Sequence, residues 1–156
     1  MRKAMLLVAV FGLAGTLWAA DPTVGTWKLN ITKSKFAPTE SAPKEETLVI
    51  RELGDQFEMV ITGVQADGKP ISARLSHSQQ GGVVKIISGL SLPENAMVVQ
   101  SVIGPGEVCT TFLQDGKQFR LHHNVVSKDG KTMVQTNKFM DTKGQAIETL
   151  NFWEKQ

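Results

Sequence analysis

Short turn signals recur along this chain and leave segments between them that suit strands. Most lie about 10 to 14 residues apart, and they include Gly54-Asp55, Asp67-Gly68, Asp115-Gly116 and Asp129-Gly130. An Asp-Gly pair between alternating apolar and polar residues favours a tight hairpin, because both central residues of that turn need positive φ. The intervening runs show no helical period. The pattern therefore predicts an antiparallel meander.

Ten alternating runs carry the predicted strands, and two other stretches break the rhythm. Residues 31–46 hold two prolines and many polar residues, so we expect a loop with a helical turn, and residues 89–96 form a second, shorter loop. The predicted strands lie within residues 24–30, 46–53, 56–64, 70–77, 82–88, 96–103, 107–114, 117–127, 131–141 and 145–155.

So many strands in one small domain need protected edges. Closure into an up-and-down barrel removes sheet edges altogether. The sequence therefore predicts an all-β fold, an antiparallel barrel of eight to ten strands of lipocalin type. A two-sheet sandwich is the alternative, because periodicity does not report closure.

Alternation within each run assigns side chains to the two faces of the sheet. On the last strand Leu150 and Phe152 favour the inner face, although Glu148 shares their parity. Outward positions are predicted for Glu58, Arg74, Arg120, His122 and Asn124. Inward positions are predicted for Gly25, Trp27, Leu29, Phe57, Met59, Ile61, Ala73, Leu75, Phe119, Leu121, His123, Val125, Met133, Gln135, Asn137 and Phe139.

Residues 1–20 have the layout of a secretory signal peptide. Two cations, Arg2 and Lys3, precede an apolar run that ends in small residues. That run is shorter than the roughly 20 residues of a spanning helix. We expect cleavage near Ala19 or Ala20, a single mature domain over residues 21–156, a periplasmic or extracellular location, and no stable membrane insertion after cleavage.

Charge and cysteine content narrow the possible partners. The chain has 17 Lys+Arg and 15 Asp+Glu, so removing Arg2 and Lys3 leaves 15 of each sign. A mature chain without net charge argues against nucleic acid as a partner. Cys109 is the one cysteine, which excludes an internal disulfide.

Several stretches carry a resemblance to a known family. Gly25-x-Trp27 at the start of a small exported meander resembles the lipocalin and fatty-acid-binding superfamily. The stretches "GTWKLNITKSKFAP", "TGVQADGKPIS", "VVSKDGKTM" and "EKQ" are similar to small bacterial exported lipocalin-like proteins, a group without established function. The resemblance implies a lipocalin-like barrel with Gly25 and Trp27 at the closure of one end, and it implies no catalytic mechanism.

The resemblance also implies a cation over the tryptophan. In lipocalins an arginine from the last strands packs on this ring, as a cation–π contact. No arginine follows Arg120 in this chain. Lys138, Arg120 or a protonated His123 are the candidates for that role.

Motifs for catalysis or metal binding are missing from the sequence. It contains no Gly-x-Ser-x-Gly and no His-Glu-x-x-His. His122 and His123 are adjacent on a predicted strand, so their side chains point to opposite faces and do not chelate one metal together. We therefore expect no enzyme activity, no cofactor and no metal site.

The leading functional prediction is that the barrel interior binds a small apolar ligand. A few polar groups in an apolar cavity is the usual composition of such sites. The alternative is a non-enzymatic structural or interaction module of the cell envelope, with a barrel filled by side chains and a protein partner that the sequence does not identify. The predicted ligand-binding residues are Phe57, Met59, Phe112, His123, Met133, Gln135, Asn137 and Phe139.

Overall fold

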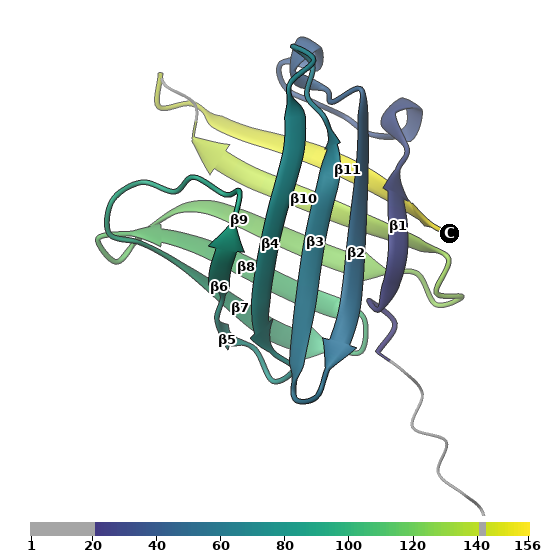
Figure 1. The fold of residues 1–156 in the computed structure, drawn as a ribbon. Coiled ribbons are helices and arrows are strands. Elements are labelled where there is room, and N and C mark those ends of the chain that lie inside the picture. Colours follow the sequence, from purple (N-terminus) through teal and green to yellow (C-terminus); the bar gives the residue numbers. More distant parts are fainter. Residues whose placement is uncertain (1–20, 141–142) are drawn as a thin grey trace, which may run out of the picture.

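The protein is an antiparallel β-barrel, seen in a computed structural model that describes residues 21–140 and 143–156 (Figure 1). The predicted signal peptide, residues 1–20, lies outside the described residues. The described part contains no helix long and apolar enough to span a membrane. Its eleven strands are β1 (Gly25–Leu29), β2 (Glu45–Leu53), β3 (Gln56–Val64), β4 (Pro70–Ser78), β5 (Gly82–Val83), β6 (Lys85–Ser88), β7 (Ala96–Gly104), β8 (Glu107–Gln114), β9 (Lys117–Val126), β10 (Thr132–Met140) and β11 (Ala146–Lys155).

The loop between β1 and β2 contains the helical turn that the sequence predicts, in fact two. These are the short 3-10 helices η1 (Ile31–Lys33) and η2 (Thr39–Ser41). The Asn30 side chain caps η1 by accepting a hydrogen bond from the Lys33 backbone N–H at 3.0 Å. Beyond η1, Lys35 and Leu150 exchange backbone hydrogen bonds, so this loop continues the pairing of β11 where β1 ends.

One chain segment, residues 82–88, closes the barrel. The strands lie side by side in the order β5-β7-β8-β9-β10-β11-β1-β2-β3-β4-β6, so the two ends of the sheet are consecutive in sequence. β5 pairs with β7 and β6 pairs with β4. The switch occurs at Val84, which is buried and donates its backbone N–H to the Val98 oxygen at 2.8 Å.

This closure decides between the two architectures that the sequence allows. A single continuous sheet with joined ends is a barrel, so the sandwich alternative is wrong and the barrel prediction is confirmed. The predicted eight to ten strands become eleven because residues 82–88 form two short strands. The tight turn predicted at Asp115-Gly116 is also present, because both residues have positive φ, 49° and 75°.

Trp27 plugs one end of the barrel. Its side chain is fully buried, and its indole N–H donates to the Thr23 carbonyl oxygen at 2.7 Å. A large indole surface and a satisfied N–H together make a stable core residue. The core cluster around it consists of Leu29, Leu48, Ile50, Phe57, Met133 and Trp153.

Lys155 supplies the cation that covers Trp27. The two residues are directly opposite in the β1–β11 pair, so their side chains share a face. The Lys155 Nζ lies 5.0 Å from the centroid of the indole ring and donates to the Pro22 oxygen at 3.2 Å. The three cations considered from sequence were therefore wrong. Lys138 pairs with Glu148, His123 pairs with Glu107, and Arg120 packs on other aromatic rings.

Gly25 is needed because the lysine stem passes directly over it. A Cβ placed on Gly25 would lie 2.6 Å from the Lys155 Cε, and Gly25 has φ +139°. A residue with a side chain would be strained at this φ, and the end of the Lys155 side chain would have to shift to make room for it. The predicted role of Gly25 in a close approach is confirmed.

The predicted facing of β9 is wrong, and a β-bulge is the reason. Phe112 pairs with Arg120 and Leu113 with Gln118, so Phe119 is an extra residue on β9. Phe119 packs against the core beside Phe112, with ring centroids 6.1 Å apart. Such a bulge resets the alternation of the strand. Arg120, His122 and Asn124 consequently line the interior, while Leu121, His123 and Val125 take the outer face.

The predicted facing of β11 is also wrong. Thr149, Asn151 and Trp153 line the interior, which places Leu150 and Phe152 outside. Phe152 is covered there by the loop after β1, since the Lys33 Nζ lies 5.0 Å from its ring centroid. The prediction from alternation assumed that apolar side chains point inward. It could not detect an outer loop that covers apolar residues on the other face.

Replacing Trp27 with alanine tests the plug. We expect Trp27→Ala to lower the free energy of unfolding by about 3–5 kcal/mol, because it empties a large buried volume. Urea denaturation measures the change. Leu53→Ala, at a side chain that is 54% exposed, is the control and should change stability by about 0.5 kcal/mol or less. A small effect at Trp27 would mean that the indole does not hold this end of the barrel.

A second substitution tests the contact between Gly25 and the lysine stem. Gly25→Ala should cost about 1–3 kcal/mol of stability from strain and overpacking. The matched control is Gly116→Ala, which also has positive φ but meets no atom within 4 Å of its Cβ. Thermal denaturation of both variants separates backbone strain from steric clash. Equal losses would show that the lysine contact contributes nothing.

Candidate functional site: a two-sided barrel cavity

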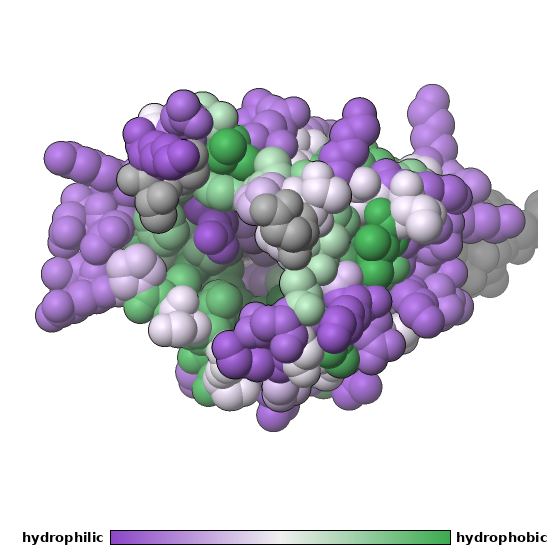
Figure 2. All heavy atoms as spheres, turned by 90° about the horizontal axis from the view of Figure 1, so that it is seen from above, coloured by the Kyte–Doolittle hydropathy of each residue, from purple (hydrophilic) through white to green (hydrophobic). Residues whose placement is uncertain are grey.

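The barrel encloses a cavity of about 360 Å³. Figure 2 looks down on one end of the molecule, where a hollow has hydrophobic walls with hydrophilic residues inside it. Seven of the eight predicted ligand-binding residues line the cavity: Phe57, Met59, Phe112, Met133, Gln135, Asn137 and Phe139. The structure thus brings together nearly all of the predicted set, although their binding role stays a prediction.

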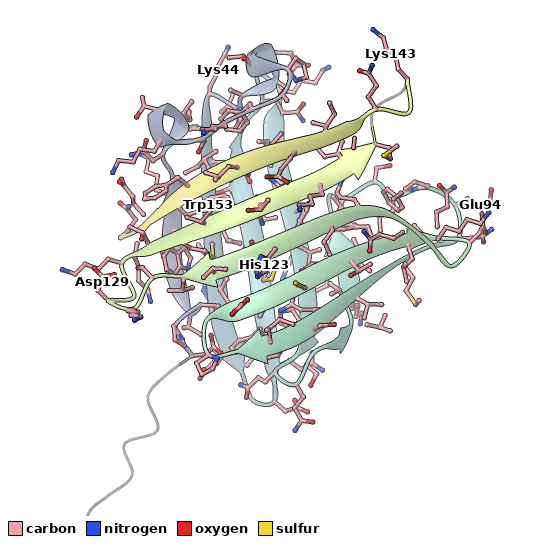
Figure 3. The ribbon with its side chains drawn as sticks, turned by 180° about the vertical axis from the view of Figure 1, so that it is seen from behind. Lys44, Glu94, His123, Asp129, Lys143 and Trp153 are labelled. Carbon is pink, nitrogen blue, oxygen red and sulfur yellow. The ribbon has the colours of Figure 1, made fainter. Side chains whose placement is uncertain are left out.

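His123 is the exception, and its predicted position inside the barrel is wrong. It lies on the outer face of β9, with Nε2 2.9 Å from a Glu107 carboxylate oxygen. Figure 3 views this side of the barrel from behind and labels His123 on β9. The bulge at Phe119 accounts for the difference, because it exchanges the two faces of the strand.

One wall of the cavity is almost entirely apolar. It is built by β2, β3 and β4 together with the closing segment and the start of β7. Glu46 and His77 are its polar members. The apolar side chains on this wall are Leu48, Ile50, Phe57, Met59, Ile61, Leu75, Val84, Leu90 and Val98.

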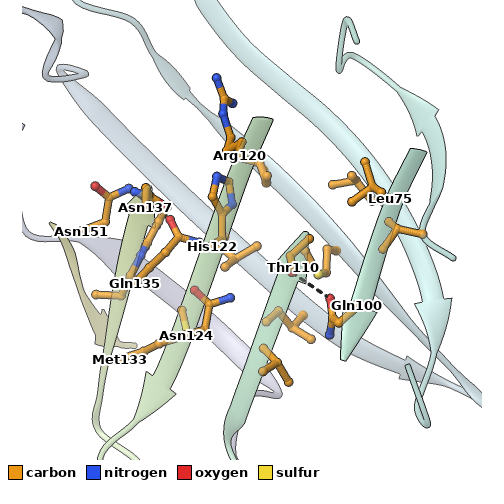
Figure 4. A pocket seen from close by; sticks show the side chains of 18 of the residues that line it. Leu75, Gln100, Thr110, Arg120, His122, Asn124, Met133, Gln135, Asn137 and Asn151 are labelled. Atoms are coloured by element: carbon orange, nitrogen blue, oxygen red, sulfur yellow. Dashed lines mark hydrogen bonds between the residues drawn. The ribbon is translucent and has the colours of Figure 1, made fainter. Parts of the chain in front are cut away.

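The opposite wall, on β7 to β11, carries polar side chains in register among apolar ones such as Met133, Phe139 and Trp153. The first polar row crosses five strands, because each residue pairs with the next: Gln100, Thr110, His122, Asn137 and Thr149. The second polar row lies beside it and consists of Asn124, Gln135 and Asn151. Figure 4 shows side chains of both rows on adjacent strands.

Hydrogen bonds within the rows are few. The Thr110 hydroxyl donates to Gln100 Oε1 at 3.4 Å, and Asn137 Nδ2 donates to Thr149 Oγ1 at 3.1 Å. In the second polar row Asn151 Nδ2 donates to Gln135 Oε1 at 3.2 Å. Much of the hydrogen-bonding capacity of these two rows therefore stays directed at the cavity.

Four buried polar atoms in this region have no hydrogen-bond partner among the described residues. They are Arg120 Nε, Asn124 Oδ1, Asn137 Oδ1 and Trp153 Nε1. Their residues all line the cavity, and Asn137 and Trp153 are more than nine-tenths buried. A buried polar atom without a partner costs about 1–3 kcal/mol, so such a group needs an explanation in a native protein. A bound molecule that completes these hydrogen bonds is one such explanation.

Arg120 brings a positive charge to the polar wall. Its guanidinium carbon lies 5.7 Å from the ring centroid of Phe112 and 5.6 Å from that of Phe139. No carboxylate of the described residues forms an ion pair with it. The two rings stabilise the cation but leave its hydrogen-bond donors without an acceptor.

Burial changes the protonation of three cavity groups. Burial, with a smaller contribution from the charge of Arg120, lowers the pKa of His122 to about 4. Burial also lowers the pKa of His77, whose Nδ1–H donates to the Ser78 oxygen at 2.8 Å. Burial raises the pKa of Glu46 to about 7. At neutral pH both histidines are uncharged and Glu46 is partly protonated, which leaves Arg120 as the cation on the polar wall.

Several cavity residues were missed from sequence, and for some a signal existed. His77 continues the parity of Ala73 and Leu75 on β4, and Thr110 shares the parity of Phe112 on β8. Extending those alternations would have placed both inside. Arg120, His122 and Asn124 had no such signal, because an apolar-in rule sends them outside.

The described residues contain no group of three or more His, Cys, Asp or Glu side chains arranged to hold a metal ion. The polar groups of the cavity are amides, hydroxyls, two uncharged imidazoles, one guanidinium and the carboxyl groups of Asp21 and Glu46. Such an arrangement can bind and orient a molecule by hydrogen bonds and charge.

Comparison with known proteins gives structural matches alone. No family model and no curated protein matches the chain. Similar solved structures include EF1p2_mFAP2b bound to DFHBI (10% identity, TM-score 0.43, covering 88% of this chain and 97% of that one). Others are the redesigned beta barrel mFAP1 bound to DFHBI (9%, 0.39, 86% and 95%) and the siderocalin Ex-FABP (11%, 0.41, 86% and 71%). The antiparallel barrel is observed, whereas the lipocalin resemblance and kinship with bacterial exported proteins stay predictions.

Glu46 gives a pH test of the cavity. Burial raises its pKa from the ordinary 4.5 to about 7 in the folded protein, so its contribution to stability is present below pH 4.5 and is lost as the pH rises to 7. Glu46→Gln should therefore match the parent chain at pH 4 and exceed its stability at pH 8 by on the order of 2 kcal/mol. Urea denaturation at both pH values measures this.

His122 changes stability in the opposite direction, since its lowered pKa removes stability as the pH falls from 6.5 toward 4. Comparing variant and parent at each pH cancels that contribution. A constant difference between the two chains from pH 4 to pH 8 would show that Glu46 is not buried in the cavity wall.

Proposed function

We propose that this protein is an exported, non-enzymatic binding protein that holds a small, largely apolar molecule in its barrel interior. The observation that carries the proposal is the cavity of about 360 Å³ whose lining includes buried polar atoms without partners. Ligand pockets are typically about 300–1,000 Å³ with a few placed polar groups. The size of the cavity and its mixed lining both fit that description.

The cavity also favours one of the two functions that the sequence allows. A structural module with a filled barrel would bury apolar side chains against one another and satisfy its polar groups internally. Here the apolar wall and the polar wall face a shared space instead. Ligand binding is therefore the better supported of the two.

Support for export comes from the composition of residues 1–20, with two cations, an apolar run and small residues in that order. Intact-mass measurement of the protein from the envelope fraction tests this part. A chain that begins at Ala20 or Asp21 is the expected result. A chain that retains residues 1–20 would contradict it.

Binding to the interior can be tested with N-phenyl-1-naphthylamine, an uncharged dye that fluoresces in apolar sites. We expect saturable binding with one dye per chain. Gln135→Trp should weaken binding by about tenfold or more, because it fills the cavity from β10 and adds strain there. Thr136→Trp is the matched control, since its side chain is on the outer face of the same strand.

Native mass spectrometry of protein purified from its own envelope looks for the natural ligand. A bound mass of a few hundred daltons is the expected result. No saturable dye binding, together with the apo mass alone, would overturn the proposed function.

A further inference from the structure

The unequal walls of the cavity specify more than an apolar ligand. We propose that the ligand is a flat acid, with its acid group on Arg120 and a hydroxyl or N–H group at its other end, facing Asn137 or Asn124. This inference rests on the proposed function and names the chemical class of molecule for that same cavity. It follows from three separate features of the lining.

The first feature is a cation that lacks an anion. Arg120 lies between two phenyl rings, with its buried Nε unpartnered and no ion pair to the described residues. Phe112 and Phe139 are the residues that pair with Arg120 on the two neighbouring strands, and neither ring offers an acceptor for its buried Nε. A guanidinium edge matches a carboxylate or sulfonate, which accepts two parallel hydrogen bonds. Figure 4 places Arg120 beyond His122, at one end of the polar wall.

Neighbouring groups do not neutralise this cation. His122 is uncharged at neutral pH, and Glu46, whose pKa burial raises to about 7, forms no ion pair with Arg120. The Asp21 carboxylate also lines the cavity, but it accepts the Thr23 backbone N–H at 2.8 Å in the turn before β1, at the plugged end of the barrel. An acid on the ligand therefore meets a free positive charge at Arg120.

The second feature is a pair of unpartnered acceptors. Asn124 Oδ1 and Asn137 Oδ1 are buried oxygen atoms without a partner among the described residues, so each can accept a hydrogen bond from a donor on the ligand. An ionised acid group has no hydrogen to donate, which means that a different group must serve them. Asn137 pairs with His122, two residues along β9 from Arg120. Two residues of a strand span about 7 Å, so the donor group lies about that far from the acid.

The third feature is the opposite wall. Phe57, Met59 and Leu75 present a continuous apolar surface across the cavity from the polar wall. A ring system fits between the walls, with one edge toward the amides and its remaining surface against these side chains. A simple alkyl chain with a single head group would leave the amide oxygens without donors.

Three naphthalene compounds separate these requirements on the full chain. 6-Hydroxy-2-naphthoate carries both groups at opposite ends of a flat ring system, 2-naphthoate carries the acid alone, and 2-naphthol carries the hydroxyl alone. Each competes with N-phenyl-1-naphthylamine at pH 7.5. We expect 6-hydroxy-2-naphthoate to bind about tenfold or more tightly than 2-naphthol, and about threefold to tenfold more tightly than 2-naphthoate.

Protein variants assign each gain to a residue. Arg120→Gln should remove the advantage of the acid and leave 2-naphthol binding within about twofold of the parent. Asn137→Leu, of similar size, should remove the advantage of the hydroxyl and leave 2-naphthoate binding intact. Arg51→Gln is the control, because Arg51 is an exposed arginine of β2 outside the cavity lining. Thermal denaturation confirms that each variant folds.

The results separate this inference from the proposed function. If the dye binds but 2-naphthol competes as well as 6-hydroxy-2-naphthoate, or neither acid competes at millimolar concentration, the ligand class is overturned and the binding function stands. If the acid is preferred but Arg120→Gln leaves that preference unchanged, the assignment to Arg120 is overturned. Failure of the dye itself to bind overturns the proposed function.

Discussion

Backbone pairing of residues 82–88 with two different strands is the constraint that every other feature of this barrel depends on. β5 joins the sheet at β7 and β6 joins it at β4, so the sheet is nearly closed and encloses a volume. Once the sheet is closed, the side chains of one face share an interior. The cavity, its two walls and the plug at Trp27 all follow from that topology.

Different strands supply different kinds of side chain to the interior. β2 to β4 supply apolar side chains that hold the fold together, and β9 to β11 supply amides, hydroxyls and Arg120. Burying that polar wall opposes folding, because several of its atoms lack partners in the protein. The plug compensates at the other end, where Trp27, Trp153 and Met133 are the most deeply buried side chains.

How far the sequence could predict this molecule depends on where local rules apply. Turn chemistry and alternation found the strands, the barrel and seven of the eight proposed cavity residues, because hairpins and core strands obey those rules. The bulge at Phe119 broke the alternation, and the loop over Phe152 hid apolar residues outside. Lys155 was overlooked because its contact with Trp27 depends on the pairing of strands 128 residues apart, which no local pattern reports.

The seam at Val84 has a dynamic consequence. Two residue pairs join β5 to β7, and three join β6 to β4. By comparison, β9 and β10 share seven pairs, and β2 and β3 share nine. Segments with few pairs open at a lower free-energy cost than the global transition. The backbone amides of residues 84–88 should therefore exchange with solvent before those of β3 or β10. The same local opening would expose the cavity without unfolding the plug, which gives a molecule in the interior a route of entry and release.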